Sequence, residues 1–338
     1  MTSVATGYLL VFAAGVFQGS FMLPMKFTRR WAWENTWLVF SISAYLLWPW
    51  LIVLLELPHF HTVLARTSSH SLLLLGLFGL AWGVGALTFG LGVDRLGLGL
   101  GFTVIIGLTV SAGSLIPMVV LSPDELGRPK GLLTILALVL VVIGIAVCAW
   151  AGKLRGTQRD LRGALSPSSY AVGLAFCVIS GLLSSSANLG FTFGGEVIEK
   201  AIDLGAREAM AGNSVWALMT IPLFMCNATY CVWLLKRRAT ARLYFLPEAR
   251  PYWGWGVLMG FSWIAGFVCY APGVRRLGTL GPSVGWAIMM ATMIITANLW
   301  GVIFREWKEA SRSALALLFG GVGVLIVAIW VVGHAGGP

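Results

Sequence analysis

Charged residues are scarce in this chain of 338 residues. Only 11% are charged and 58% are hydrophobic, whereas a soluble domain carries about 25% charged residues. Apolar runs of about 20 residues recur, and in a bilayer such runs form helices because the backbone must satisfy its own hydrogen bonds. The runs lack the polar–apolar alternation of a membrane β-barrel. These shortages exclude a large soluble core and predict an all-α polytopic membrane protein.

Ten such runs predict ten transmembrane helices. They lie at 4–25, 36–57, 71–93, 99–121, 131–152, 170–194, 209–235, 253–273, 280–304 and 313–334. The longest charged connection, 153–169, divides them five and five. We therefore expect a first five-helix repeat over 1–152, a linker over 153–169 and a second five-helix repeat over 170–338. No basic residue precedes Lys26, so the first run lacks a signal-peptide flank and is interpreted as a retained helix.

The basic residues are distributed unevenly over the connections between runs. Sixteen of the 23 follow runs 1, 3, 5, 7 and 9, and seven lie in the other connections. Basic loops stay in the cytoplasm, so both termini are predicted to face the periplasm of a bacterial inner membrane. The net charge of +10 then comes from basic loops that face the cytoplasm, so the expected partner is the lipid bilayer and we expect no nucleic acid.

Motifs for catalysis, cofactors and metals are missing from the sequence. The five cysteines lie within apolar runs and lack metal-type spacing. There is no phosphate-binding loop, and the serines at 184–186 have no histidine base nearby. We therefore expect no enzyme activity, no cofactor and no metal site.

The chain contains an internal repeat. Residues 79–97 and residues 260–278 share eight identities in nineteen positions, including Trp82 with Trp263. A weaker match, at an offset of 166, links run 1 with run 6. Because each half has an odd number of runs, the repeats must be inverted. Inverted repeats are typical of secondary transporters, which bind their substrate near the bilayer midplane between the repeats.

Polar and aromatic side chains in mid-run positions are suited to a sugar, whose hydroxyls need hydrogen-bond partners and whose apolar faces stack on rings. The candidates are Gln18, Trp82, Ser184, Asn188, Asn213, Trp216, Asn227, Trp263, Tyr270 and Trp286. A buried Asn also bonds neighbouring helices and a lone Trp also fills space, so for one residue the two interpretations are evenly matched. Their gathering on repeat-related runs 1, 3, 6 and 8 favours binding.

Acidic residues are missing from the middle of every run, although intramembrane charges are normally functional. This argues against export of cations and leaves coupling to H⁺ or Na⁺ without a central carrier. Two acids at run ends are the candidates for coupling. Glu34 lies at the predicted cytoplasmic start of run 2, and Glu196 follows run 6 on the periplasmic side. For Glu34, a purely structural interaction with the helix dipole is the alternative.

Three stretches carry a family pattern. They are 24–37, with Trp-Ala-Trp-Glu and then Trp-Pro-Trp at 48–50; 79–101; and 305–310, with Glu-Trp. Here, and in segment order, the chain resembles the bacterial L-rhamnose–proton symporter family, a branch of the drug/metabolite transporter superfamily. The resemblance implies ten helices, two five-helix repeats and sugar uptake. It also implies Gln, Asp, Tyr and His side chains in run 9, where only Trp286 matches the pattern, so substrate and ion stay open.

The leading prediction is a secondary transporter that imports a neutral, rhamnose-like monosaccharide by alternating access, coupled to an ion. The alternative is an exporter or exchanger of another small metabolite, such as an amino acid, a drug-like compound or a nucleotide sugar. A membrane sensor or scaffold is disfavoured because the chain has no soluble domain. Runs 5 and 10 are almost purely apolar. We expect them to be peripheral helices, in a monomer or at a homodimer contact.

Overall fold

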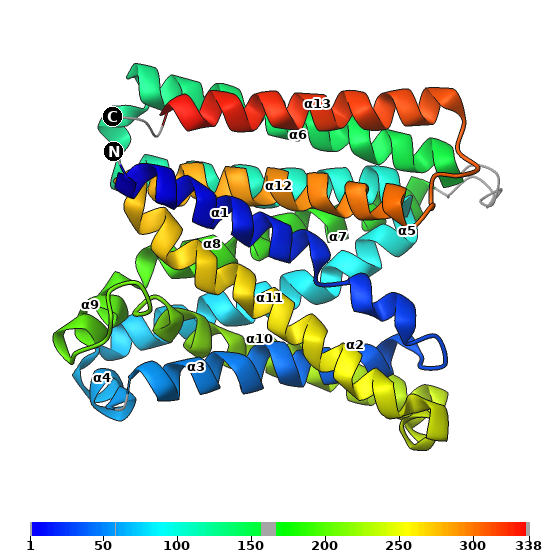
Figure 1. Cartoon of the computed structure of the whole chain (residues 1–338), viewed down its shortest axis with the longest axis horizontal. Coiled ribbons are helices and arrows are strands. Elements are labelled where there is room, and N and C mark those ends of the chain that lie inside the picture. The colour runs from blue at the N-terminus through cyan, green and yellow to red at the C-terminus, as the bar shows by residue number, and fades with distance from the viewer. Residues whose placement is uncertain (1, 58, 157–166, 336–338) are drawn as a thin grey trace.

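The computed structural model describes residues 2–57, 59–156 and 167–335, and Figure 1 shows them as a bundle of helices. Within these ranges, ten helical spans are long and apolar enough to cross a membrane. The predicted all-α polytopic fold is confirmed. In hydrocarbon the backbone must close its own hydrogen bonds, and a helix does so within one segment.

Short helical segments connect or interrupt the long helices along the chain. The helices of the first five spans are α1 (Thr2–Ser20), η1 (Leu23–Phe27), α2 (Trp33–Ser41), η2 (Ile42–Leu47), α3 (Trp48–Glu56), α4 (Phe60–Arg66), α5 (Ser69–Leu121), η3 (Pro123–Glu125) and α6 (Pro129–Gly156). Those of the last five are α7 (Pro167–Ser184), α8 (Ser186–Phe193), α9 (Gly195–Asp203), α10 (Asn213–Arg238), η4 (Thr240–Phe245), η5 (Pro247–Ala249), α11 (Arg250–Arg276), α12 (Gly281–Ile303) and α13 (Arg312–Ala335). Helices α6 and α7 extend into the predicted linker 153–169, of which 157–166 lie outside the described residues.

Helix α5 holds two spans, Ser69–Leu96 and Leu100–Leu121. In a straight helix, residues eight positions apart are separated by about 12 Å. A Cβ added to Gly101 would instead lie 3.1 Å from the Cα atom of Val93. The backbone of α5 therefore turns back on itself between its two arms, which supply spans 3 and 4.

Two other spans are irregular. Span 2 consists of α2 and α3 joined by η2, a π-helical turn that carries Tyr45. Such wide turns frequently occur at functional sites. Span 6 breaks at Ser185, between α7 and α8, and again at Gly194, where α9 begins. A Cβ on Gly194 would lie 2.8 Å from a methyl group of Val215, so the close contact between α8 and α10 requires glycine there.

Helices α6 and α13, which supply spans 5 and 10, lie side by side at one edge of the bundle (Figure 1). Glycines allow their close approach, since a Cβ on Gly144 would lie 2.7 Å from the side chain of Leu325. Their outer faces expose large apolar side chains. These include Leu132, Leu136, Val139, Phe319, Ile326 and Val327.

Repeat-related glycines lie at contacts between the first five spans and the last five. Gly79 of span 3 abuts Met219 of α10 in span 7, where a Cβ would clash. Its repeat partner, Gly260 of span 8, abuts Ser43 of η2 in span 2 in the same way. Span 3 thus contacts span 7 while span 8 contacts span 2.

Two more glycine pairs follow this exchange of partners. Gly85 of span 3 faces α7 of span 6, and its repeat partner Gly266 of span 8 faces α1 of span 1. Gly15 of span 1 faces α12 of span 9, and Gly181 of span 6 faces the second arm of α5, which is span 4. In each pair, the two spans that touch in one contact are replaced in the other contact by the spans at the equivalent positions of the opposite five-span set. For example, the contact of spans 1 and 9 corresponds to the contact of spans 6 and 4.

The bundle has two different ends, which we name for what they carry. The terminal end holds residues 2 and 335 and the connections 59–68, 122–128, 204–212 and 277–280. The basic end holds the connections 21–32, 239–249 and 304–311, and the part of α5 between spans 3 and 4, residues 97–99. In Figure 1 the terminal end lies at the left and the basic end at the right.

Candidate functional site

A row of aromatic rings lies in the middle of the bundle. Trp82 of α5 and Trp263 of α11 stack with their ring centroids 5.6 Å apart. Phe267 packs against these two rings at 5.6 Å and 4.6 Å, and Trp216 of α10 lies 4.5 Å from Phe267. We call these four residues the aromatic row. Because Trp82 belongs to the first five spans and the others to the last five, the row bridges the two sets.

Further rings extend the aromatic row in both directions. On one side, Phe191 stacks on Trp216 at 4.9 Å with 7° between the ring planes, and Tyr270 lies 5.7 Å from Phe191. On the other side, Phe40 lies 6.5 Å from Trp263. The resulting path of rings offers several faces on which the C–H surface of a sugar can stack.

A hydrogen-bonded cluster adjoins the aromatic row. The Tyr270 hydroxyl donates to Asn188 Oδ1 at 2.6 Å. Asn188 Nδ2 donates to the carbonyl oxygens of Gly113 at 2.8 Å and Pro282 at 3.0 Å. The ring of Trp286 lies 5.9 Å from that of Tyr270. The structure thus brings three predicted binding residues together, and all three are buried.

The remaining predicted residues are more widely spread. Gln18 Nε2 donates to the Trp263 carbonyl oxygen at 2.9 Å, so Gln18 lies beside the aromatic row. Asn213 is buried one turn before Trp216 on α10. Asn227 lies toward the basic end and accepts a hydrogen bond from an indole N–H of α2 at 3.0 Å. Ser184 lies at the contact of α7 with α5. The last two are outside the row.

Sequence reasoning missed two members of this centre, Phe191 and Phe267, whereas Trp216 was among the mid-run candidates. Helical spacing offered a signal for both. Phe267 follows Trp263 by four residues and Phe191 follows Asn188 by three, which places each on the same helix face as a predicted residue. Hydropathy alone treats both as ordinary core residues.

A cavity of about 290 Å³ opens at the terminal end, between α8 and α9 on one side and α11 and α12 on the other. Its lining includes Phe191, which stacks on Trp216, and Pro282, whose carbonyl oxygen accepts from Asn188. It also includes the polar residue Thr192. The cavity therefore extends from the terminal end to the edge of the central rings.

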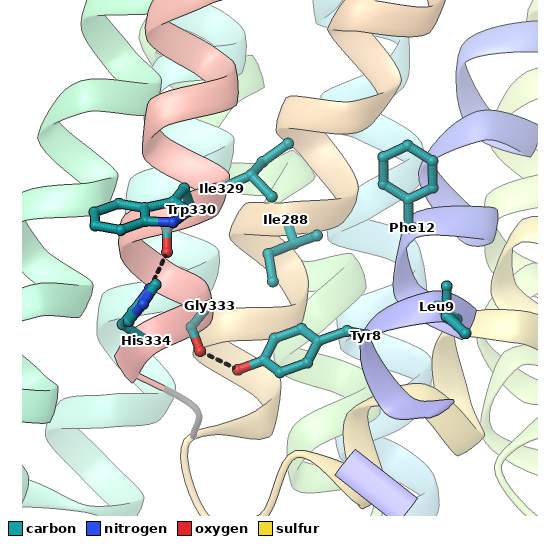
Figure 2. Close-up of a pocket in the computed structure, with 8 residues that line it drawn as sticks. All are labelled: Tyr8, Leu9, Phe12, Ile288, Ile329, Trp330, Gly333 and His334. Atoms are coloured by element: carbon teal, nitrogen blue, oxygen red, sulfur yellow. Dashed lines mark hydrogen bonds between the residues drawn. The ribbon is translucent and has the colours of Figure 1, made fainter. Parts of the chain in front are cut away.

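A larger cavity, of about 590 Å³, lies on the side of the bundle. Figure 2 shows its lining, which comprises Tyr8, Leu9 and Phe12 of α1, Ile288 of α12, and Ile329, Trp330, Gly333 and His334 of α13. The Tyr8 hydroxyl donates to the Gly333 carbonyl oxygen at 2.6 Å. Because this lining is mainly apolar and Leu9 and Trp330 are exposed on the outer surface, the cavity suits hydrocarbon better than a hydroxylated substrate.

Glu34, in the first turn of α2, is fully buried near the basic end. Its carboxylate accepts hydrogen bonds from Thr240 Oγ1 at 2.7 Å and from Arg238 at 3.2 Å. Next to it, Asn35 Nδ2 donates to the Thr240 carbonyl oxygen at 3.1 Å. A buried charge requires such partners. They tie span 2 to the last residue of α10 and to the segment that follows it.

Other contacts join the connections of the basic end. Glu306 pairs with Lys26 and, at 3.2 Å, with Arg155. Partial burial opposes ionisation of Glu306, but the two cations outweigh it and hold the pKa of this carboxyl below its ordinary value. Trp31 packs edge-on against Tyr244 at 5.1 Å. Burial raises the pKa of the Tyr244 phenol, whose hydroxyl stays a donor.

Glu196 lies at the terminal end, in the first turn of α9. Its carboxylate accepts from the Ser68 amide and the Ser68 hydroxyl, both at 2.7 Å, and from the Ser71 hydroxyl. These bonds connect α9 to the start of α5. Glu196 therefore lies at the opposite end of the bundle from Glu34, the other predicted coupling residue.

Comparisons with known proteins agree over nearly the whole chain. The model of the L-rhamnose-proton symport protein family matches residues 2–336. The L-rhamnose-proton symporter of Cronobacter sakazakii is 27% identical over 320 residues, which are 93% of this chain and 92% of that protein. The proteins of that name from Salmonella paratyphi A and Escherichia coli are 28% and 26% identical over the same shares.

Proposed function

The chain belongs to the L-rhamnose-proton symport protein family, and we propose that it imports L-rhamnose, or a similar neutral monosaccharide, together with protons. The aromatic row carries this proposal, because it lies where the first and last five spans meet. L-Rhamnose is a 6-deoxy sugar with a methyl group and apolar C–H faces. Such faces stack on aromatic rings while the hydroxyls bind neutral polar groups.

The sugar would bind between the aromatic row and the cluster of Asn188, Tyr270 and Trp286. These side chains are neutral, as recognition of an uncharged substrate requires, and Gln18 adds an amide beside Trp263. The cavity at the terminal end supplies the entry route. Asn227 and Ser184 would act outside the first contacts with the sugar.

Alternating access would come from two inverted repeats, 1–152 and 170–338, rocking against each other around this site. The exchanged glycine contacts support the repeats. Gly79 packs on span 7 where Gly260 packs on span 2, and Gly85 packs on span 6 where Gly266 packs on span 1. Two halves of the same fold in opposite orientation produce this pattern.

The basic end would face the cytoplasm and the terminal end the periplasm of a bacterial inner membrane. The uneven distribution of basic residues supports this orientation, with 16 at or near the basic end. The cavity at the terminal end then opens outward, and the contacts of Trp31, Glu34 and Glu306 close the inward side. An outward-open state is the one that an importer loads.

Glu34 is the best candidate for the coupling proton site. Protonation would remove the negative charge to which Arg238 and Thr240 bind, and so loosen the contact between span 2 and the segment after α10. Glu196 is the second candidate, although its bonds to Ser68 and Ser71 lie at the terminal end. Substitution of a Na⁺ gradient for the proton gradient distinguishes the two ions.

A homodimer through α6 and α13 is compatible with the apolar outer faces of these helices. A monomer surrounded by lipid would expose the same faces. Light scattering of the purified protein in detergent and in lipid nanodiscs distinguishes the two states.

The test of the proposed function is uptake of radiolabelled L-rhamnose by liposomes that contain the purified protein. We expect accumulation under an inward proton gradient, and its loss when an uncoupler collapses the gradient. Empty liposomes are the control. Failure to take up any sugar, with exchange of amino acids or nucleotide sugars instead, would contradict import and favour the exporter or exchanger.

A further inference from the structure

Three buried polar atoms near the aromatic row have no hydrogen-bond partner within the described ranges. They are Thr192 Oγ1, Asn213 Oδ1 and Trp216 Nε1. Native proteins satisfy most buried polar atoms, so each exception calls for an explanation. All three occur where the end of α8 packs on the start of α10, a junction fixed by the stacking of Phe191 on Trp216.

The positions of these residues relate them to one another and to the cavity. Asn213 and Trp216 are three residues apart on α10 and therefore share a helix face. Each is 1% exposed. Thr192 follows Phe191 directly and lines the cavity that opens at the terminal end. Thr192 thus lies on the cavity, and Trp216 of the aromatic row is linked to the same cavity through Phe191, which stacks on it.

The chemistry of the three atoms matches a hydroxyl group. An indole N–H only donates, an amide oxygen only accepts, and a threonine hydroxyl does both. A sugar hydroxyl also donates and accepts, so it can bind Trp216 and Asn213 at once, while the ring of Trp216 or Phe191 provides an apolar face for stacking. A charged ligand would find no opposite charge among these three side chains.

We propose that Thr192, Asn213 and Trp216 form a hydroxyl-binding subsite for the transported sugar. The proposal rests on the proposed function and deepens it, because it names the groups that select for hydroxyls. The unpaired atoms are the partners that the sugar satisfies when it enters from the terminal end. A sugar that lacks the corresponding hydroxyl leaves them unpaired and binds less tightly.

The test compares Trp216→Phe with the wild type in counterflow of radiolabelled L-rhamnose into liposomes. Phenylalanine keeps an aromatic ring but removes the N–H. We expect the half-saturation concentration for L-rhamnose to rise on the order of tenfold, which corresponds to about 1.4 kcal/mol. Each monodeoxy derivative of L-rhamnose is then used as a competitor. One derivative should inhibit L-rhamnose counterflow with the same affinity in Trp216→Phe and in the wild type. That derivative lacks the hydroxyl that Trp216 binds, so removal of the indole N–H costs it no further affinity.

Trp48→Phe is the matched control. Trp48 Nε1 is also buried without a partner among the described residues, but its ring packs on Phe261, which is not part of the aromatic row. We expect its half-saturation concentration to stay within twofold of the wild type. Thr192→Val, which removes a hydroxyl at nearly constant shape, is a second variant should Trp216→Phe lower the melting temperature.

The outcomes separate the subsite from the function. If Trp216→Phe and Thr192→Val both weaken binding of every derivative by the same factor, or leave it unchanged, the subsite is wrong although the wild type transports the sugar. If the wild type binds no sugar at all, the proposed function fails and the subsite with it.

Discussion

The terminal end and the basic end of the bundle are held by different kinds of contact. At the terminal end the ion pairs of Arg207 with Glu56 and of Arg275 with Glu208 lie at the surface, where a pair is worth about 0–1 kcal/mol. At the basic end the carboxylate of Glu34 is fully buried, although its partner Arg238 is exposed, and a hydrogen bond to a charged group is worth about 1.5–3 kcal/mol. Closure is therefore stronger at the basic end, while the cavity gives access at the other.

In the proposed transport cycle, this asymmetry corresponds to one state. To release a substrate at the basic end, the protein must break the contacts of Glu34 and Glu306 and close the cavity beside Phe191. If the two ends have these separate roles, changes at one end should act differently from matched changes at the other.

The largest effect, all or none, is expected for labelling from outside the cell. Thr279 lines the cavity at the terminal end, and Ser311 lies at the basic end; both are exposed. In intact cells a membrane-impermeant maleimide should label Thr279→Cys but not Ser311→Cys, which should react only after permeabilisation. The wild type, whose cysteines lie in the spans, gives the background. The reverse pattern would invert the proposed orientation.

Filling the cavity is expected to reduce uptake at least about tenfold. Gly195 lines the cavity, and a Cβ there would meet no atom within 4 Å. The Trp side chain of Gly195→Trp should occupy the space that the sugar crosses. Gly254→Trp is the matched control at the start of α11, near the basic end, where a Cβ also meets nothing within 4 Å. Equal initial rates of uptake in the two variants would contradict the entry route.

The next effect compares the two candidate carboxyls. Glu34→Gln should lower proton-driven uptake on the order of tenfold, because an amide cannot bind and release the coupling proton as a carboxylate does, while counterflow without a gradient stays within twofold. Glu196→Gln should leave both activities within twofold. If Glu34→Gln reduces driven uptake and counterflow equally, its role is structural rather than coupling.

The smallest effect concerns the stability of the basic end. The lowered pKa of Glu306 means that its ionised form stabilises the fold above the ordinary glutamate pKa, about 4.3, and that this contribution is lost as the pH falls through the lowered value. Glu306→Gln should lower the free energy of unfolding by less than about 1 kcal/mol at pH 7. It should not change that free energy at a pH below both the lowered pKa of the folded state and the ordinary pKa of the unfolded state. Thermal melts measure it, with Glu248→Gln, whose partner Arg30 lies at 3.9 Å, as the weaker control.

Much of the fold was predictable because membrane spans produce a strong signal. A run of about 20 apolar residues has few alternatives to a helix, and all ten spans were located in this way. The internal repeat also paired Trp82 with Trp263, which the structure stacks directly. The sequence related these two residues by the repeat and placed both near the midplane, but it did not predict their contact.

The partners of the candidate residues were not predictable, for a physical reason. Glu34 binds Arg238, 204 residues away, and Asn188 binds Tyr270, 82 residues away. A glutamate in the first turn of a helix has the same neighbours in sequence whether it interacts only with the helix dipole or also with a distant arginine. Likewise, Phe267 is indistinguishable from a core residue until its packing against Trp82 and Trp263 is seen.

The exchanged glycine contacts have a consequence for the biosynthesis of the protein. The close approaches of Gly15, Gly79 and Gly85 are all made to helices beyond residue 167. At a translation rate of about 5–20 residues per second, the nascent first five helices wait on the order of 10–40 s for those partners. During that interval their glycine-lined faces meet only lipid or an insertion factor. Either half synthesised alone would therefore be a substrate for quality-control proteolysis.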